Sequence, residues 1–247
     1  MGRLQDRVVV VTGGATGIGG AASQMFATEG ALSVIVDYNQ TEGGAAAEAI
    51  RSAGGRAEFH ALDVRSAEQT AQVFERIGAT HGHIDVLVCS AGVLQGAYRG
   101  IADLEEEAWD ATIDTNLKGT YLSTKFAAPW LRKSEQSVLL LIASGAGVRG
   151  GSSSFAYAAS KAGIHGMQYN FERDLDTTRV HEICPGGIAT PLKLLNIAQG
   201  AESRGEDSNA AVDAARKALG DPVGVAKVLT FLASDDGDYV RGTVFTR

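Results

Sequence analysis

The chain has 247 residues, a length that suits one large α/β domain. Its 29 acidic and 22 basic residues leave a formal net charge of −7, which disfavours nonspecific binding to nucleic acid or to an anionic membrane surface. We see no signal peptide and no apolar run approaching the ~20 residues of a membrane span. Only Cys89 and Cys184 are cysteines, which indicates a reducing compartment. We expect a cytoplasmic protein.

Apolar strand-like runs alternate with helical patterns along the chain. The expected strands are Val8–Val11, Leu32–Val36, Ala57–Leu62, Ile84–Val88, Val138–Ala143, Arg179–Cys184 and Thr243–Thr246. The expected helices are Ile18–Glu29, Thr41–Ala53, Ser66–Thr80, Leu104–Asn116, Gly119–Lys133, Phe155–Asp176 and Val223–Ala233. Several strands are continuous Val, Ile and Leu, as in a parallel sheet covered on both faces. This order predicts a Rossmann-type doubly wound α/β fold with a parallel sheet of about seven strands.

The chain shows no repeat and no linker, so we expect residues 1–247 to form a single domain. Ser66 opens a capping-box pattern, and Asp221-Pro222 places an N-cap before a proline at the first helical position. The stretch Ala201–Ala211 is polar and rich in small residues, and we interpret it as a loop or mobile segment.

The first expected strand runs into a glycine-rich turn, Thr12–Gly19, and a helical pattern follows. Glycines let the backbone approach a pyrophosphate closely, and the helix N-terminus offers free N–H groups to the anion. The spacing is Gly-x3-Gly-x-Gly and lacks the Gly-Lys-Ser/Thr ending of a P-loop, so a nucleotide triphosphatase is disfavoured. The predicted cofactor contacts in this turn are Gly13, Thr16, Gly17, Ile18 and Gly19.

The second strand ends at Asp37, 18 residues past Gly19, near the separation at which an acidic residue binds the adenosine ribose. A carboxylate there accepts hydrogen bonds from the ribose hydroxyls and repels a 2′-phosphate. At an effective dielectric constant of about 20, two charges ~4 Å apart interact by roughly 4 kcal/mol. Asp37 therefore favours NAD over NADP.

Tyr157 and Lys161 stand at i and i+4, which places them on one face of a helix. A free tyrosine is a poor base at neutral pH, and a neighbouring ammonium stabilises its phenolate. We therefore expect Lys161 to lower the pKa of Tyr157. Ser144 follows a buried-type strand, at whose carboxyl end ligands bind in such sheets. Its hydroxyl could hold a substrate carbonyl beside Tyr157.

With these features the sequence resembles the short-chain dehydrogenase/reductase family in its compact, single-domain form, over nearly the whole chain. The residues that carry the resemblance are Thr12–Gly19, Asp63-Val64, Ala91-Gly92, Asn116, Ser144, Tyr157-x3-Lys161 and Pro185-Gly186-x3-Thr190. Their agreement in one order is far more specific than any single match.

The resemblance implies a role for each of these residues. Tyr157 would be the acid/base, Lys161 would also bind the nicotinamide ribose, Ser144 would orient the carbonyl, and Asn116 would hold a water of a proton relay. The implied cofactor contacts continue with Asp63, Val64, Ser90, Ala91, Gly92, Pro185, Gly186, Ile188 and Thr190. Asp63 would bind the adenine amino group, and Ile188 and Thr190 would touch the carboxamide.

The chain departs from the family pattern at several positions. Ser90 stands where the family usually has Asn, so only its backbone carbonyl can make the usual contact. The sequence stops at Arg247 without the family's usual Asp-Gly-Gly-like tail, which helps to build subunit contacts. We expect a homo-oligomer. Because the tail is absent, a dimer is an alternative to the family's usual tetramer.

The implied function is NAD(H)-dependent oxidation of a secondary alcohol or reduction of the matching ketone. We expect the segment Leu192–Leu219, within a lid around residues 191–219, to be mobile and to cover the substrate. We expect Leu94, Gln95, Gly145, Ala146 and Gly151 to line the substrate pocket. A 3-oxoacyl-thioester reductase is an alternative that usually goes with NADPH, against Asp37. A non-catalytic NAD(H)-binding sensor or scaffold is another. The five histidines show no metal-ligand spacing, so no metal is expected.

Overall fold

The computed structural model describes residues 2–247, and its centre is one all-parallel sheet of seven strands. The strands are β1 (Val8–Thr12), β2 (Leu32–Asp37), β3 (Arg56–Ala61), β4 (Val86–Cys89), β5 (Val138–Ile142), β6 (Arg179–Cys184) and β7 (Gly242–Phe245). Their order in the sheet is β3-β2-β1-β4-β5-β6-β7, so the direction of winding reverses between β1 and β4. This confirms the predicted doubly wound sheet and its seven strands, whose ends differ from the predicted ones by at most two residues.

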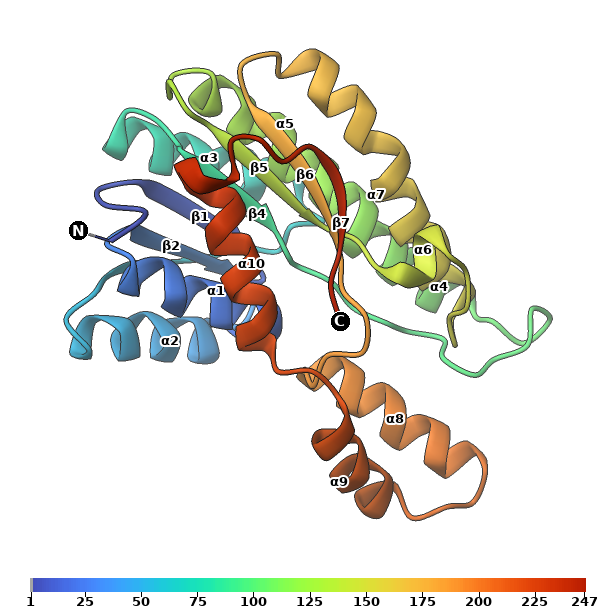
Figure 1. Ribbon diagram of the computed structural model, residues 1–247. Coiled ribbons are helices and arrows are strands. Elements are labelled where there is room, and N and C mark those ends of the chain that lie inside the picture. Colours follow the sequence, from blue (N-terminus) through green and yellow to red (C-terminus); the bar gives the residue numbers. More distant parts are fainter. Residues whose placement is uncertain (1) are drawn as a thin grey trace.

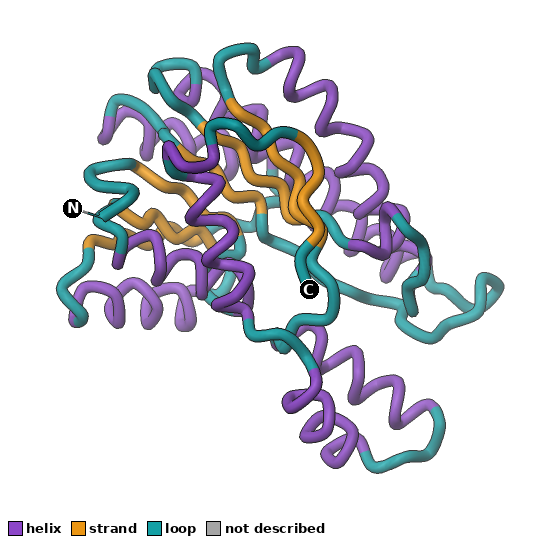
Figure 2. Tube along the Cα trace, in the orientation of Figure 1, coloured by secondary structure: helices purple, strands orange, loops and turns teal. Residues whose placement is uncertain are grey.

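Helices cover both faces of the sheet (Figures 1 and 2). The α-helices are α1 (Gly17–Thr28), α2 (Gln40–Ser52), α3 (Ala67–His81), α4 (Glu106–Ile113), α5 (Gly119–Leu131), α6 (Gly145–Val148), α7 (Phe155–Asp174), α8 (Pro191–Ser203), α9 (Ser208–Ala218) and α10 (Pro222–Ala233). One apolar cluster joins the sheet to α3, α5 and α7, and a second joins it to α1 and α10. The central strands β1, β4 and β5 are almost wholly apolar because both of their faces are buried.

Two predicted N-caps are confirmed. Ser66 Oγ accepts the amide of Gln69 at 3.3 Å, and Asp221 Oδ1 accepts the amide of Val223 at 2.8 Å. Both side chains satisfy amides that the first turn of a helix leaves without a partner.

The interpretation of Ala201–Ala211 as a loop is wrong. Helix α8 continues to Ser203 and α9 begins at Ser208, so only four residues connect them. Asp207 caps α9 by accepting the amides of Asn209 and Ala210, and the alanines that suggested a loop are strong helix formers. The two helices form a hairpin that extends from the body of the molecule (Figure 1).

The expected helices Leu104–Asn116 and Gly119–Lys133 are one continuous helical segment. A five-residue π-helical turn, Asp114–Lys118, joins α4 to α5. Such a turn inserts one extra residue into the helix, and π-turns often mark functional sites. This one contains Asn116.

Candidate active site

A cavity of about 1070 Å³ opens at the carboxyl ends of the strands, where the winding of the sheet reverses. Nearly all of the predicted site residues line it: Gly13, Thr16, Gly17, Ile18, Asp37, Asp63, Val64, Ser90, Ala91, Gly92, Ser144, Tyr157, Lys161, Pro185, Gly186, Ile188 and Thr190. Gly19 and Asn116 do not; both are buried. The fold thus brings to one cavity residues that lie more than 170 positions apart in the sequence.

The glycine turn needs its glycines for close packing. Gly13 has φ +65°, and a Cβ there would lie 2.6 Å from Cα of Ala91. A Cβ on Gly19 would lie 2.1 Å from the Gly13 carbonyl oxygen. Thr16, the N-cap of α1, makes no side-chain capping bond, so the first amides of the helix stay open toward the cavity. These amides and the positive end of the helix suit a phosphate group.

Asp37 is held at the cavity wall by two backbone amides. Its Oδ2 accepts from Ala15 at 3.2 Å and its Oδ1 from Asn39 at 3.1 Å. The two bonds fix the carboxylate between the glycine turn and the start of α2. This is the position that a ribose-binding carboxylate requires.

Asp63 is partly engaged in a contact that sequence reasoning missed. The Arg65 guanidinium pairs with it, with Nη2 at 2.6 Å from Asp63 Oδ2. Hydrogen bonding to Arg65 lowers the pKa of Asp63. The pair could have been suspected from two opposite charges two residues apart in a loop. An adenine amino group would share the carboxylate with Arg65.

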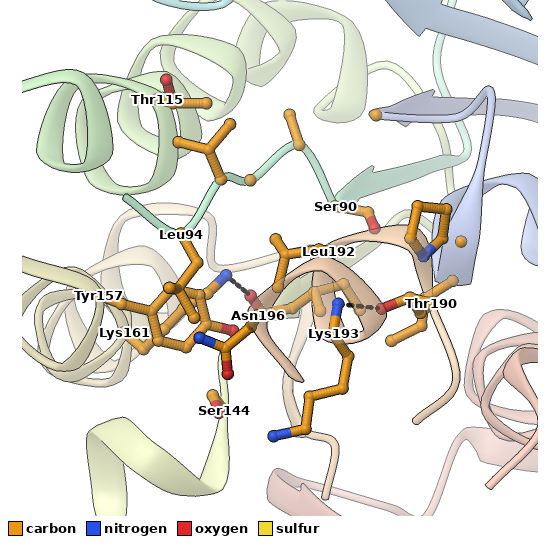
Figure 3. Close-up of a pocket in the computed structure, with 18 of the residues that line it drawn as sticks. Ser90, Leu94, Thr115, Ser144, Tyr157, Lys161, Thr190, Leu192, Lys193 and Asn196 are labelled. Carbon is orange, nitrogen blue, oxygen red and sulfur yellow. Dashed lines mark hydrogen bonds between the residues drawn. The ribbon is translucent and has the colours of Figure 1, made fainter. Parts of the chain in front are cut away.

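The candidate catalytic side chains come from two neighbouring elements. Ser144 follows β5, and Tyr157 stands in the first turn of α7. Ser154 fixes that turn, because its Oγ accepts the amide of Tyr157 at 3.3 Å and donates to the Gln95 carbonyl at 2.7 Å. Lys161 lies one turn later on the same helix, and Figure 3 shows Ser144, Tyr157 and Lys161 gathered on one side of the cavity.

The expected lowering of the Tyr157 pKa by Lys161 is not found in this structure. Burial raises the pKa of the phenol above its usual value, and only hydrogen bonding with Ser144 lowers it. Lys161 Nζ lies 5.6 Å from the Tyr157 ring centroid and donates to the Ile142 carbonyl at 2.7 Å. Burial lowers the pKa of Lys161 to about 8, since the side chain is only 4% exposed. Desolvation therefore outweighs the attraction on which the sequence argument relied.

Asn116 forms part of the frame behind the cavity. Its Nδ2 donates to the Val93 carbonyl at 2.9 Å and to Ser160 Oγ at 3.0 Å, and its Oδ1 accepts the amide of Val93. These bonds tie the π-turn to α7 and to the strand-end loop. A Cβ on Gly92 would lie 3.3 Å from Asn116 Oδ1 and 3.7 Å from Lys161 Nζ, so the three residues meet there.

The helical hairpin contributes one wall of the cavity. Leu192, Lys193 and Asn196 of α8 line it, and the Lys193 amide donates to Thr190 Oγ1 at 3.3 Å (Figure 3). Asn196 Nδ2 donates to Ser153 Oγ at 2.9 Å, which connects α8 to the loop before α7. Sequence reasoning named the segment but not these contacts, because nothing in the chain pairs positions 153 and 196. Leu94, Gln95, Gly145, Ala146 and Gly151 also line the cavity, as predicted.

Residues 2–247 contain no group of three His, Cys, Asp or Glu side chains placed to hold a metal ion. None of the helices in this part of the chain is long and apolar enough to cross a membrane. Cys89 and Cys184 are both buried, and neither forms a disulfide within these residues.

The fold and the cavity define a dinucleotide-binding α/β protein, and comparison with known proteins gives the family. The family model of the short chain dehydrogenases matches residues 7–198. The chain belongs to the short-chain dehydrogenase/reductase family, whose members are oxidoreductases that bind a nicotinamide cofactor.

Individual relatives match over nearly their whole length. The chain is 34% identical to 3-oxoacyl-[acyl-carrier-protein] reductase FabG of Thermotoga maritima, covering 98% of this chain and 96% of that protein. It is 31% identical to cyclopentanol dehydrogenase of Comamonas testosteroni, with the same coverage of 98% and 96%. The crystal structure of levodione reductase superposes with a TM-score of 0.89 at 26% identity, covering 98% of this chain and 96% of the other.

Proposed function

We propose that this protein is an NAD(H)-dependent oxidoreductase that transfers a hydride between the nicotinamide ring and a secondary alcohol or ketone. The observation that carries the proposal is one cavity lined by the glycine turn, by Asp37 and by the Ser144, Tyr157 and Lys161 side chains. The carboxyl ends of β1, β2 and β3 form the proposed binding site for a dinucleotide. Beside it, Ser144 after β5 and Tyr157 and Lys161 of α7 are the groups that can hold or move a proton.

The residues present fit a nicotinamide dinucleotide. The uncapped amides of α1 suit its pyrophosphate, and the Asp37 carboxylate suits its adenosine ribose. The remaining proposed contacts are Asp63, Val64, Ser90, Ala91 and Gly92 at the ends of β3 and β4, and Pro185, Gly186, Ile188 and Thr190 after β6. When bound, the cofactor gives or takes the hydride.

The protein's own part of the reaction is control of geometry and of one proton. In the reductive direction, Ser144 Oγ holds the substrate carbonyl oxygen, and the Tyr157 hydroxyl donates its proton to that oxygen. In the oxidative direction, Tyr157 removes the proton from the alcohol. Burial keeps the pKa of Tyr157 raised, and we propose that the Lys161 ammonium, 5.6 Å from the ring centroid, makes the phenolate easier to form than it would be without that charge. Asn116 holds the π-turn in place, and a water bound there would pass a proton to Lys161.

We also propose that residues 1–247 act as a single domain in which the hairpin of residues 191–219 is the substrate lid. The lid joins the body through adjacent segments, where the Ala189 amide donates to the Gly220 carbonyl at 2.8 Å. Its apolar Leu192 and polar Lys193 both line the cavity, so the lid can select substrates. A homo-oligomeric state and a cytoplasmic location stay predictions from the sequence.

The test is the Tyr157→Phe variant, assayed through the absorbance of reduced nicotinamide with a panel of secondary alcohols and ketones. Loss of the phenolic proton should reduce kcat by about 100-fold or more while NADH still binds. Retained turnover would remove Tyr157 from the acid/base role. Tight NADH binding by the wild-type protein without turnover of any substrate would instead favour a non-catalytic NAD(H) sensor.

A second candidate activity is reduction of a 3-oxoacyl thioester, which the 34% identity to the Thermotoga maritima reductase favours. The position of Asp37 argues against a cofactor with a 2′-phosphate. Comparing an acetoacetyl thioester with simple ketones, each with NADH and NADPH, separates the two activities.

A further inference from the structure

A buried polar cluster lies between α7 and the last two strands, next to the active site and outside its cavity. Glu182 of β6 is 0% exposed, and its Oε2 accepts from His165 Nδ1 at 2.6 Å and from Thr243 Oγ1 at 2.7 Å. Thr243 Oγ1 also lies 3.2 Å from Oε1 of Gln168, which is 0% exposed. Glu182 Oε1 has no hydrogen-bond partner among residues 2–247. A buried carboxyl group with one free oxygen is costly and calls for an explanation.

The cluster and the candidate catalytic pair share one helix face. Tyr157, Lys161 and His165 are spaced by four residues on α7, so they follow one another along the side that faces the sheet. Lys161 Nζ is bonded to the carbonyl of Ile142, whose strand neighbour is Ile183, the residue next to Glu182. The carboxylate and the ammonium therefore occupy the same closed space between α7 and the sheet.

Few other charges reach this space. The titratable groups that face Lys161 are Tyr157 on its own helix, Cys89 of β4, and Glu182 and Cys184 of β6. The groups around Glu182 are His165 of α7 and Cys184, together with the neutral Gln168 and Thr243. Both thiols have pKa values of about 12, raised mainly by burial, so they carry no charge at neutral pH. Glu182 is thus the carboxylate that can balance the buried ammonium.

We propose that Glu182 is a positioning residue that acts through Lys161: its carboxylate, held by His165 and Thr243, keeps the Lys161 side chain as an ammonium beside Tyr157. None of the ion pairs within residues 2–247 includes Lys161. Burial lowers its pKa to about 8, while Cys184, Cys89 and Glu182, in that order of effect, raise it. Without Glu182 the lysine would lose its proton closer to neutral pH and could no longer stabilise the phenolate. This inference rests on the proposed role of Lys161.

The direct test is the titration of Lys161 itself, which needs no substrate. In protein labelled with 13C at lysine Cε, the NMR signal that disappears in Lys161→Met identifies the residue. We expect Glu182→Gln and the apolar Glu182→Met to lower its titration midpoint by about one pH unit. Glu182→Asp, which keeps the charge, should restore most of the midpoint. The matched control is Glu172→Gln, which removes a half-exposed carboxylate from the same helix.

The proposal would be overturned if a folded Glu182→Gln or Glu182→Met variant had the same Lys161 titration midpoint as Glu172→Gln. A second readout is the pH profile of kcat, whose alkaline limit should move to lower pH in Glu182→Gln while KM changes little. If Glu182 had a merely structural role, Glu182→Gln would lower kcat equally at all pH values, and that result would also count against the proposal. If the wild-type protein turns over no substrate, the proposed function fails, and the NMR midpoints still decide the role of Glu182.

Discussion

The proposed preference for NAD can be tested by removing one charge while changing the shape of the site little. Asp37→Asn is the suitable change, because its amide oxygen can still accept one of the two backbone N–H groups, from Ala15 or from Asn39, that the two carboxylate oxygens accept. Asp37→Ala would remove these bonds together with the charge and would mix the two effects.

The expected size follows from the position of the carboxylate. A 2′-phosphate ~4 Å away would be repelled by roughly 4 kcal/mol at an effective dielectric constant of about 20, and by about 1 kcal/mol in bulk water. Asp37 is half-buried at the cavity wall, between these limits. We expect Asp37→Asn to improve the affinity for NADPH relative to NADH by about 10- to 100-fold, with a smaller effect at high salt.

The assay is the dissociation constant of each reduced cofactor, measured by nicotinamide fluorescence, so no substrate is needed. Glu48→Gln is the control, because Glu48 belongs to α2, like the cavity-lining Glu42, but does not itself line the cavity. An unchanged ratio of the two constants in Asp37→Asn would refute the electrostatic argument. Equal binding of NADH and NADPH by the wild-type protein would refute it as well.

Three further predictions concern stability. Gly19→Ala should destabilise the fold by about 1–3 kcal/mol and weaken NADH binding, because the new Cβ would overlap the Gly13 carbonyl oxygen. The control is Gly44→Ala, whose Cβ meets nothing within 4 Å and which should be neutral or slightly stabilising. Equal melting temperatures of the two variants in thermal unfolding would contradict the packing argument. Burial lowers the pKa of His181 to about 4 from 6.5, so stability should fall by about 3 kcal/mol as the pH falls through that range. Urea unfolding of wild type and His181→Asn tests this, and the same pH dependence in both would refute it. Lys161→Met should raise stability near pH 7 by about 2 kcal/mol, because it removes the cost of a buried ammonium; a lower urea midpoint would count against that cost.

The sequence by itself determined the fold class and most of the candidate site. Short continuous Val, Ile and Leu runs bounded by turn residues indicate strands covered on both faces, and the glycine turn after β1 indicates a place where a phosphate would bind. The residues that predicted the site are local motifs, such as Thr12–Gly19 and Tyr157-x3-Lys161. Their chemistry depends on spacing along one element, which a sequence records directly.

Only the tertiary structure decided what depends on contacts between distant residues. It joined α4 to α5 through a π-turn at Asn116, and it brought Asn196 to Ser153 and Glu182 to His165. It also reversed the expected direction of the Tyr157 pKa. Spacing shows that Lys161 shares a helix face with Tyr157, but burial depends on how the whole protein packs. Desolvation of the buried phenolate raises the pKa of Tyr157, and this effect outweighs the attraction to Lys161 that was estimated without burial.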